Sequence, residues 1–536
     1  MKLYNYLFSF LILTPLFGHS QTPTIGLTYY SDSVSEGYTL FSPDLNNHVY
    51  LINNCGERVN EWIFNEAPGI SSYLLPNGNL LCAGKDSLTI RDWSDNTVWS
   101  YATTDNGIKQ HHDIEPLPNG NILCIVTQNL TTTEQTDAGK DSSLVGGNFR
   151  LDKIVELQPV GTNDAIVVWE WRFFDHLVQD YDNSKNNYGI VENHPELIDF
   201  NFDHGNINDW THLNSVDYNA DLDQIMISSR HMSELYIIDH STTTLEAAGH
   251  TGGSAGMGGD ILWRWGNPRV YRQGTAVDQK LFGQHDGKWV ENGFAHEGKI
   301  SVFNNDADGT MNFSSVHVLQ PNLSGFNYLL SNSTFDPVNF SDTWNGDNVS
   351  PVIYSSKKCS VQSLENGGYL VNDSGSGRFV EVNANHDVVW SYTNPHGNGA
   401  VSNQFDVISG GFNGAFRVHK YAPDYPGIAI QTLTTIGIIE DVNSLSLACS
   451  TLDIEEDIIV TDHLITNPII NGVIEFINPP IEGTITLINM QGQEVQNWEI
   501  EGGTSYHLER CAPGSYILQM NSSDGMSIHR LVVAPY

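Results

Sequence analysis

A repeated turn motif constrains the fold of this chain more than any other feature. The segment LPNGNLLC at 75–82 recurs as LPNGNILC at 117–124, a shift of 42 residues (117 − 75), and LENGGYL at 364–370 is a looser copy. In each copy an apolar stretch enters an Asn-Gly pair and another leaves it, which is typical of a β-hairpin. A repeat of about 40 to 45 residues built of short strands is typical of a β-propeller blade.

A second recurring pattern is a short aromatic strand in which large and polar residues alternate. It occurs as EWIF at 61–64, VWSY at 98–101, VWEW at 168–171, LWRW at 262–265 and VWSY at 389–392. Together the two patterns predict an all-β fold, a six-bladed β-propeller over residues 37–430. A β-sandwich explains the hairpins but not the 42-residue repeat.

The charge excludes one class of function. The 536 residues include 63 Asp and Glu against 24 Lys and Arg, a net charge of −39. Phosphate backbones bind through Lys and Arg, so we expect no nucleic-acid partner. Forty per cent of the residues are hydrophobic and ten per cent aromatic, enough for a packed core.

The N-terminus predicts export. Lys2 precedes an apolar run over 7–17, followed by GHSQ at 18–21. This run is too short for a membrane anchor, so residues 1–20 are interpreted as a secretory signal peptide. We expect a secreted or cell-surface protein, exported through the periplasm, with no membrane span in its mature chain.

The C-terminal region is expected to be separate from the propeller. A Pro-containing stretch and the acidic run 453–457 predict a linker over 431–460. Residues 461–536 then read as a small β-sandwich-like domain, with NP at 467–468, GQEV at 492–495 and PGSYIL at 513–518. These motifs resemble the C-terminal sorting domain of type IX secretion cargo, which implies that the type IX machinery is a partner.

Six cysteines are too sparse for a disulfide scaffold, and their spacing leaves the connectivity open. Cys82 and Cys124 occupy the same place in two repeats. They are either buried free thiols or one bridge.

Three histidines lie at places that a propeller brings together. His112 stands seven residues before Asn119, a position occupied by Cys359 in another copy, so the repeat itself does not require it. His212 and Arg230 lie opposite each other in a hairpin centred on Asp221. His285 precedes a further strand pair.

Because the innermost strands of a propeller line one central channel, these side chains are expected to share a pocket. Three alternatives stay open: solvated histidines, a zinc site, which Arg230 disfavours, and a Ser-His-Asp hydrolase, for which no G-x-S-x-G motif is present. The acidic segment 306–309 is interpreted as solvated, with calcium binding as its alternative.

Long strings around these residues resemble the bacterial arylsulfate sulfotransferase family. They are HHDIEPLPNGNIL at 111–123, DWTHLNSVDYNADLDQIMISSRHMSELYIIDHST at 209–242 and ILWRWGNPRVYRQGTAVDQKLFGQHDGKW at 261–289. The resemblance implies a six-bladed propeller that moves a sulfuryl group between phenols without a nucleotide sulfate donor. It assigns transient sulfation to His285 and catalytic roles to His212, Arg230 and His112. We expect Asn214 and His111 to bind substrate.

The family carries an N-terminal β-domain that helps to pair subunits, and only about 20 residues separate the signal peptide from the first blade here, so the oligomeric state stays open.

The chemistry of these residue types agrees with that resemblance. A neutral imidazole is a competent nucleophile, a guanidinium suits sulfate oxygens, and either His112 or His212 can move the phenol proton. The sequence thus predicts a ping-pong aryl-sulfate sulfotransferase with a phenolic sulfate donor, a phenolic acceptor and no cofactor. The alternatives are a sulfatase-like hydrolase and a non-catalytic surface propeller that binds glycans or proteins.

Overall fold

The computed structural model describes most of the chain. It covers residues 23–452 except 66, 68–70, 206–207, 398–399, 407 and 409–412, and then 472–476, 482–489, 493–500, 504–508, 511, 514–522 and 525–533. The predicted signal peptide at 1–20 and the acidic run at 453–457 lie outside these residues. The α-helices are α1 (Thr132–Asp137), α2 (Thr244–Ala247), α3 (Pro426–Ala429) and α4 (Ser444–Leu452). No helix in the described ranges has the length and apolar character needed to cross a bilayer.

The described residues between 26 and 421 form six antiparallel sheets of four or five strands, so the predicted all-β class is confirmed. The first three, with each sheet starting from its strand nearest the ring centre, are β33 (Ala415–Tyr421), β2 (Tyr38–Pro43), β3 (His48–Ile52) and β4 (Arg58–Ile63); β5 (Ser71–Leu74), β6 (Leu80–Ala83), β7 (Ser87–Arg91) and β8 (Thr97–Ala102); and β9 (Gln110–Pro116), β10 (Ile122–Leu130), β11 (Phe149–Val160) and β12 (Asp164–Arg172).

The other three sheets have the same order. They are β15 (Leu213–Asn219), β16 (Gln224–Ser229), β17 (Glu234–Asp239) and β18 (Trp263–Trp265); β19 (His285–Trp289), β20 (Ile300–Asn304), β21 (Ser315–Leu319) and β26 (Asp342–Asn345); and β27 (Ser360–Ser363), β28 (Tyr369–Asp373), β29 (Arg378–Val382), β30 (Val388–Thr393) and β1 (Gly26–Tyr30).

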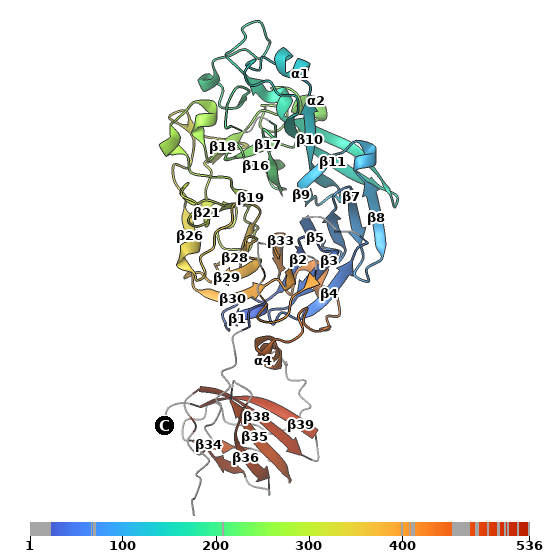
Figure 1. Ribbon diagram of the computed structural model, residues 1–536, viewed down its shortest axis with the longest axis vertical. Helices are drawn as coiled ribbons and strands as arrows, with labels where there is room; N and C mark the ends of the chain where they lie inside the picture. The colour runs from blue at the N-terminus through green and yellow to red at the C-terminus, as the bar shows by residue number, and fades with distance from the viewer. Residues whose placement is uncertain are drawn as a thin grey trace, which may run out of the picture.

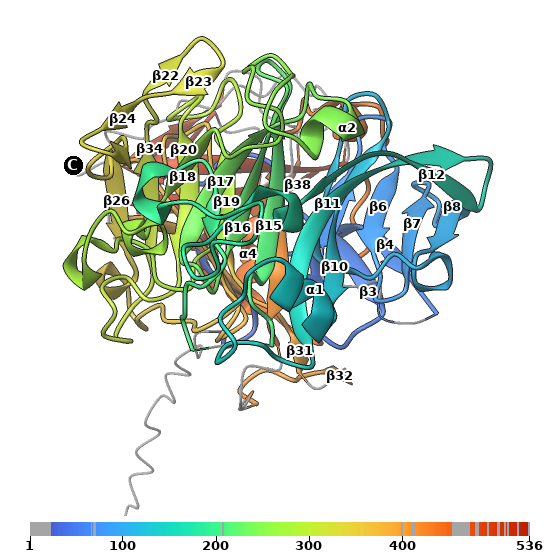
Figure 2. The same cartoon turned by 90° about the horizontal axis from the view of Figure 1, so that it is seen from above.

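The first strands of the six sheets form a ring. Strand β33 contacts β5, β5 contacts β9, β9 contacts β15, β15 contacts β19, β19 contacts β27, and β27 returns to β33. Figure 1 shows the sheets arranged around this ring. Figure 2, turned by 90°, shows β15, β16 and β17 side by side and the β11–β12 hairpin extending toward β8, which β12 contacts. Residues at the starts of these six strands are therefore brought close together.

The ring closes through strands from opposite ends of the chain. Strand β33 pairs with β2, with Val418 opposite Phe41, and β1 pairs with β30, with Tyr30 opposite Trp390. The sequence pattern did not identify either pairing.

The repeated motif forms the same hairpin loop in all three copies. Gly78, Gly120 and Gly367 each adopt φ between 82° and 86°, and each N–H donates to the leucine carbonyl three residues earlier at 2.9–3.0 Å. Only the glycine takes the left-handed conformation, because the preceding asparagine is not among the residues with positive φ. The predicted hairpins are confirmed, with a five-residue loop in place of a two-residue Asn-Gly turn.

The aromatic pattern marks the fourth strand of a sheet. Trp62, Trp99 and Trp390 are buried, and each indole N–H donates to a carbonyl in the next sheet around the ring, at Asp92, Asp164 and Asn54 respectively, at 2.7–2.9 Å. Each acceptor lies at the turn between the third and fourth strands. The tryptophans therefore hydrogen-bond neighbouring sheets to each other at their outer edges, and they also bury large apolar surfaces.

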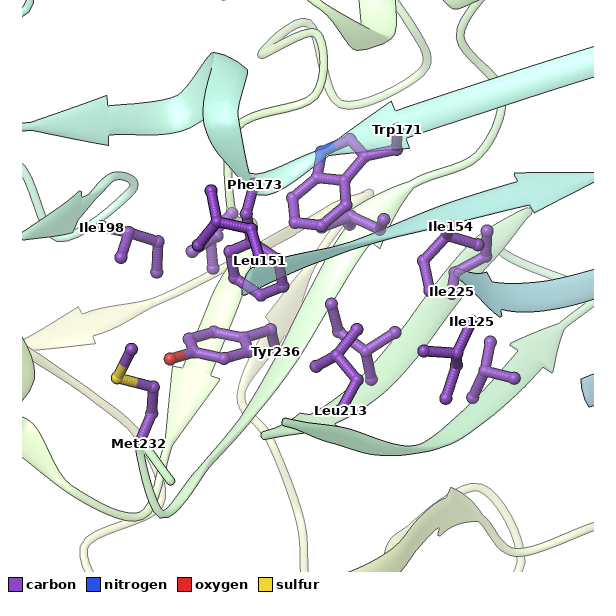
Figure 3. Close-up of a cluster of buried hydrophobic side chains, with 14 of the residues drawn as sticks. Ile125, Leu151, Ile154, Trp171, Phe173, Ile198, Leu213, Ile225, Met232 and Tyr236 are labelled. Atoms are coloured by element: carbon purple, nitrogen blue, oxygen red, sulfur yellow. The ribbon is translucent and has the colours of Figure 1, made fainter. Parts of the chain in front are cut away.

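Apolar side chains fill the space between adjacent sheets. Figure 3 shows one such cluster, in which Ile125, Leu151 and Ile154 from one sheet meet Leu213 and Ile225 from the next. Trp171 and Tyr236 extend the cluster, and all of these side chains are buried. Such packing fixes the angle between sheets and thereby the positions of the strand starts at the centre.

A disulfide joins the two ends of the ring. Cys55, in the turn before β4, is bonded to Cys449 in α4, a sequence separation of 394. The N–H of Arg58 also donates to the carbonyl of Gly437. Residues 431–452 of the predicted linker thus lie against the first and last sheets. Cys82 and Cys124 are buried free thiols.

The remaining strands form smaller units. Short pairs in the loops are β13 (Leu177–Val178) with β14 (Ile198–Asp199), β22 (Leu323–Ser324) with β23 (Asn327–Tyr328), β24 (Leu330–Ser331) with β25 (Thr334–Phe335), and β31 (His396–Gly397) with β32 (Ala400–Val401). The C-terminal region has a four-stranded sheet, β36 (Glu494–Ile500), β35 (Gly483–Asn489), β38 (Gly514–Ser522) and β39 (Gly525–Val533), and a pair, β34 (Val473–Glu475) with β37 (Ser505–His507). These strands share their own apolar cluster, which includes Ile485, Leu487 and Leu518.

Candidate active site

The predicted histidines lie at irregular starts of the innermost strands. His112 has φ 59° and His212 has φ 46°, both left-handed, and Asp286, directly after His285, has φ 55°. The pairing register shifts at β9, β15 and β19 near these positions. Bulges and left-handed residues re-aim side chains and are concentrated at functional sites. Here they turn side chains from three sheets toward the ring centre.

Two of these histidine rings lie near one aromatic side chain, and the third contacts one of the two. The centroids of His112 and His212 are 4.8 Å apart. Phe416, in β33, lies 5.8 Å from the ring of His112 and 6.3 Å from the ring of His285. The structure therefore brings together three residues that are up to 173 positions apart in the chain (285 − 112).

His285 is held in one tautomer. Nδ2 of Asn305 donates to the carbonyls of Ser355 (2.8 Å) and Lys358 (3.1 Å), so its Oδ1 faces Nδ1 of His285 at 2.7 Å. An amide oxygen only accepts, hence Nδ1 carries the proton. The backbone N–H of Lys358 donates to Nε2 at 3.1 Å. The lone pair of the imidazole is therefore on Nε2.

Burial and positive neighbours keep His285 neutral. The residue is 2% exposed. Burial lowers the pKa of His285 well below its usual value, and Arg417, His112 and Arg230 lower it further, against the hydrogen bond to Asn305. A neutral imidazole keeps its lone pair at physiological pH.

Arg230 is the predicted cation of the site. The backbone N–H of Arg230 donates to the backbone carbonyl of His212 at 3.1 Å. This bond confirms that the hairpin centred on Asp221 places the two residues opposite each other. Its guanidinium donates to the carbonyl of Ser356, and its Nε lies 3.9 Å from where a side chain on Gly283 would begin. The carbonyl of Gly283 is 3.1 Å from Nδ1 of His285. Arg230 and His285 are thus neighbours.

Asp152 and His111 together orient the ring of His112. Asp152 accepts from Nε2 of His111 at 2.8 Å, and Nδ1 of His111 lies 2.6 Å from Nδ1 of His112. If His111 is neutral, its Nδ1 accepts the proton of His112, and the lone pair of His112 is then on Nε2. Burial lowers the pKa of His112 well below its usual value, with contributions from His111 and His212.

His212 has a carboxylate partner. Its Nδ1 lies 2.6 Å from Oδ2 of Asp209, which is also 3.4 Å from the guanidinium of Arg150. Burial acts to raise the pKa of Asp209, but the hydrogen bond and charge of His212 lower it to about 2. Asp209 is therefore ionised and fixes the orientation of His212.

Arg417 is the centre of the polar layer beneath the histidines. It is buried in β33, and its guanidinium is 3.1 Å from carboxylate oxygens of both Asp113 and Asp286. It also donates to the carbonyls of Asn214 (2.7 Å) and Cys359 (2.9 Å). One side chain thus connects β33 with β9, β15, β19 and the residue before β27.

Asn214, predicted to bind substrate, is completely buried. Its Nδ2 donates to the carbonyl of Gln284 at 2.7 Å, next to His285. No donor among the described residues reaches its Oδ1. In this structure Asn214 supports the backbone on which His285 is placed.

Two cavities open on either side of the Arg417 layer. One, of about 970 Å³, is lined by Gln110, His111, His112 and the segment 354–358. The other, of about 630 Å³, is lined by Asp113, Asp286 and Lys288. Consecutive residues His112 and Asp113 therefore face different cavities. Of the six predicted site residues, only His111 and His112 line the first cavity.

The three predicted histidines do not converge on one point as a set of metal ligands. Among the described residues, the converging groups of His, Cys, Asp and Glu include neither His112 nor His285, and His212 belongs to a group without them. Asp209, His212 and His231 do converge within 4.8 Å. Arg150 lies against this group, so its charge opposes a cation there.

Sequence reasoning missed several residues of this site. Asp209 stands within the motif that singled out His212, so its spacing offered a signal. Asn305, Lys358, Phe416 and Arg417 carry none, because tertiary pairing alone brings their strands and loops to the centre.

The family model Arylsulfotransferase (ASST) matches residues 57–405, which is 349 residues (405 − 57 + 1) of the 536 and includes all six predicted site residues. No curated protein matches the chain.

Several solved structures are similar at low identity. A protein of unknown function from Bacteroides caccae is 14% identical, with a TM-score of 0.36, over 67% of this chain and 94% of that one. An inactive virginiamycin B lyase from Staphylococcus aureus is 8% identical, with a TM-score of 0.33, over 69% and 88%. The Cps50 (Swd1) β-propeller domain of Myceliophteria thermophila is 10% identical, with a TM-score of 0.33, over 69% and 90%.

Proposed function

Because the chain belongs to the arylsulfotransferase (ASST) family, we propose that it moves a sulfuryl group from a phenolic sulfate ester to a phenolic acceptor through a sulfated His285. The observation that carries this mechanism is the state of His285. Its proton is on Nδ1, its lone pair is on Nε2, and a permanent cation, Arg230, is beside it.

In the first half-reaction, the lone pair of Nε2 attacks the sulfur of the donor. An N–S bond forms, the S–O bond to the phenol oxygen breaks, and the electron pair leaves with that oxygen. Without substrate, the backbone N–H of Lys358 donates to the Nε2 lone pair of His285 at 3.1 Å. Substrate therefore has to displace this hydrogen bond. The released N–H can then donate to a sulfuryl oxygen, together with the guanidinium of Arg230.

Proton transfer is assigned to His212. The leaving phenolate takes a proton, and the acceptor phenol later gives one up to the same group. Asp209 orients His212 for this transfer, because its carboxylate lies 2.6 Å from Nδ1 of the ring and leaves Nε2 for the phenol. His112, whose pKa is lowered, is neutral and offers Nε2 as an acceptor for the phenol hydroxyl.

In the second half-reaction the acceptor oxygen attacks the same sulfur. The N–S bond breaks and its electron pair returns to Nε2, which regenerates the neutral imidazole. The product of the first half-reaction leaves before the acceptor enters, so the kinetics are ping-pong. Tyr354, which lines the 970 Å³ cavity and is half-buried, is the aromatic side chain against which an aryl ring can pack.

We also propose that residues 37–430 form a six-bladed propeller. The six sheets, their ring of innermost strands and the closure by β33 support this architecture. It gives the site its position, because a ring of strand starts converges on one axis.

Export and type IX sorting remain proposals. The disulfide between Cys55 and Cys449 supports an oxidising compartment. A chain without residues 461–536, produced in a bacterium with type IX secretion, is expected to accumulate in the periplasm, whereas the full chain reaches the surface or the medium. Equal distribution of the two chains contradicts the sorting role.

The test of the mechanism uses a chromogenic aryl sulfate with and without phenol. Wild type is expected to release the chromogenic phenol in a burst of one equivalent and to turn over only with an acceptor, whereas His285→Ala shows neither. A sulfatase-like hydrolase instead turns over without phenol and releases inorganic sulfate. Normal turnover by His285→Ala removes His285 from the mechanism.

A non-catalytic surface propeller is the remaining alternative. It predicts no sulfuryl transfer with any phenolic pair, and binding of glycans or proteins that His285→Ala leaves intact.

A further inference from the structure

Outside the active site, two histidines and a carboxylate converge on one point. Nδ1 of His176, in the 3-10 helix Phe173–His176, lies 2.9 Å from Oδ1 of Asp260. Nδ1 of His250 lies 2.7 Å from the same oxygen. The three ligand atoms are all within 4.8 Å of one another. The active-site mechanism uses none of these residues.

The proton of His176 is fixed on the other nitrogen. Its Nε2 lies 2.8 Å from the carbonyl of Ala247, at the end of α2, and a carbonyl only accepts. A neutral His176 therefore points a bare lone pair from Nδ1 at the carboxylate of Asp260. Two lone pairs at 2.9 Å require a positive charge, either a second proton on the ring or a cation between the two groups.

The surroundings are those of a metal ligand. Metal-binding histidines usually donate their other N–H to a carbonyl or carboxylate, which fixes the ring. His176 does so, and the ring of Trp171 stacks on it at 5.5 Å with an interplanar angle of 7°. His176 is completely buried, Asp260 is nearly so, and the side chain of His250 is 59% exposed. The exposed side leaves room for water as a fourth ligand.

We propose that His176, His250 and Asp260 bind a zinc ion. Two imidazole nitrogens and one carboxylate oxygen form a ligand set that zinc accepts, with bonds of about 2.0–2.2 Å. A tetrahedral ion with such bonds holds its ligands about 3.3 Å apart. The distances of 2.9 and 2.7 Å from Oδ1 of Asp260 to Nδ1 of His176 and of His250 therefore have to lengthen by only about 0.5 Å.

The ion fastens a long loop to the ring. Residues 240–262 connect β17 with β18, and both His250 and Asp260 belong to this loop, whereas His176 follows β12 of the neighbouring sheet. Figure 1 shows α2, which lies within the loop, near the end of the ring opposite β1. The role is structural, and the proposal does not depend on the sulfotransferase mechanism.

The test uses untagged full-length protein, stripped with EDTA and titrated with ZnCl₂ by calorimetry. Wild type is expected to bind one zinc ion more than His250→Asn, and its melting temperature is expected to rise by several degrees on adding ZnCl₂. His250→Asn should fold normally because residue 250 is exposed, and it should lose most of that rise.

Two controls separate this site from other histidines. His194→Asn removes a half-exposed histidine that also lies 2.9 Å from a carboxylate, Glu196, and it is expected to retain the zinc response. His231→Asn removes one residue of the group Asp209, His212 and His231, so zinc that this variant fails to bind is zinc bound at that group. Equal zinc stoichiometry in wild type and His250→Asn, with no effect of EDTA on wild-type melting, overturns the proposal and leaves a His176–Asp260 ion pair.

Discussion

Oδ1 of Asn305 lies 2.7 Å from Nδ1 of His285, although the two residues are 20 positions apart; His285 opens β19 and Asn305 directly follows β20. The amide cannot rotate without losing its two bonds to the segment 355–358. One side chain thus sets both the tautomer of the proposed nucleophile and the position of the loop whose N–H contacts Nε2.

Asn305→Leu is expected to lower kcat by on the order of 10²-fold, because the lone pair then populates both ring nitrogens. KM for the aryl sulfate should change little. Steady-state kinetics and ¹⁵N NMR of the His285 ring check this, with a mixed tautomer signal expected in the variant. The exposed Asn312 provides the control, Asn312→Ala. A single Nε2 lone-pair tautomer with unchanged kcat in Asn305→Leu contradicts the positioning role.

Asp209→Asn is expected to lower kcat by about 10- to 10³-fold, since His212 loses the carboxylate that orients its ring for proton transfer. The loss should be small for donors with acidic leaving phenols and large for donors with basic ones. A series of substituted phenyl sulfates measures this slope. Asp203→Asn, at an exposed position nearby, is the control. Equal losses across the series would exclude general acid catalysis by His212.

Arg417→Met leaves Asp113 and Asp286 buried without their shared cation, apart from Lys288, whose Nζ is 3.2 Å from Asp286. Breaking a buried pair in this way typically costs about 3–5 kcal/mol. Urea unfolding measures the cost, and Arg417→Met combined with Asp286→Asn should recover part of it. Arg58→Met, which removes a partly exposed pair with Glu61, should cost less than about 1 kcal/mol. A cost for Arg417→Met as small as that of Arg58→Met contradicts the central role of Arg417.

Cys449→Ser is expected to lower the free energy of unfolding by about 2–5 kcal/mol, because the bond between Cys55 and Cys449 closes a very long loop of the unfolded chain. A reducing agent should destabilise wild type by a similar amount and leave the variant unchanged. Thermal melting with and without reductant checks this, and Cys511→Ser is the free-thiol control. A reductant effect that persists in Cys449→Ser means that another bond is responsible.

Asp217, in the smaller cavity, gives the protein a pH-dependent stability. Burial raises the pKa of Asp217 to about 7, because it outweighs the hydrogen bond from Trp289 and the charge of Lys288, which lower the pKa; Glu291 and Asp286 add smaller increases. The folded state thus binds a proton that the unfolded state releases near pH 4. Stability from this group is present below pH 4 and is lost as the pH rises to 7.

Asp217→Asn is therefore expected to raise the melting temperature at pH 8 more than at pH 5. Melting curves across this range check the difference. Asp221→Asn, in the exposed turn of the same hairpin, is expected to show no such pH dependence. An equal effect of Asp217→Asn at both pH values contradicts the raised pKa.

Local sequence patterns were sufficient to predict the strands of the Asn-Gly hairpins and the aromatic strands. The Asn-Gly motifs predict three hairpins, and the structure contains them. The aromatic pattern predicts strands, and these are the fourth strands of their sheets. Both signals depend on residues within one turn or one strand. The placement of His212 opposite Arg230 is of the same kind, because one hairpin determines it.

The site required contacts that no local pattern encodes. Arg417 reaches Asp113 and Asp286 because β33 pairs with β2 at the other end of the chain. Cys55 bonds Cys449 for the same reason, since the ends of the ring meet there.

Residue type, spacing and turn chemistry thus determined the strands, the hairpins and which histidines, His112, His212 and His285, are candidates for chemistry. Tertiary contacts decided which atoms of those rings carry lone pairs, because Asn305, oriented by the loop at 355–358, faces His285, and Asp152, from another strand, orients His111 and through it His112. Tautomer and charge depend on neighbours within a few ångströms, and only the folded chain supplies those neighbours.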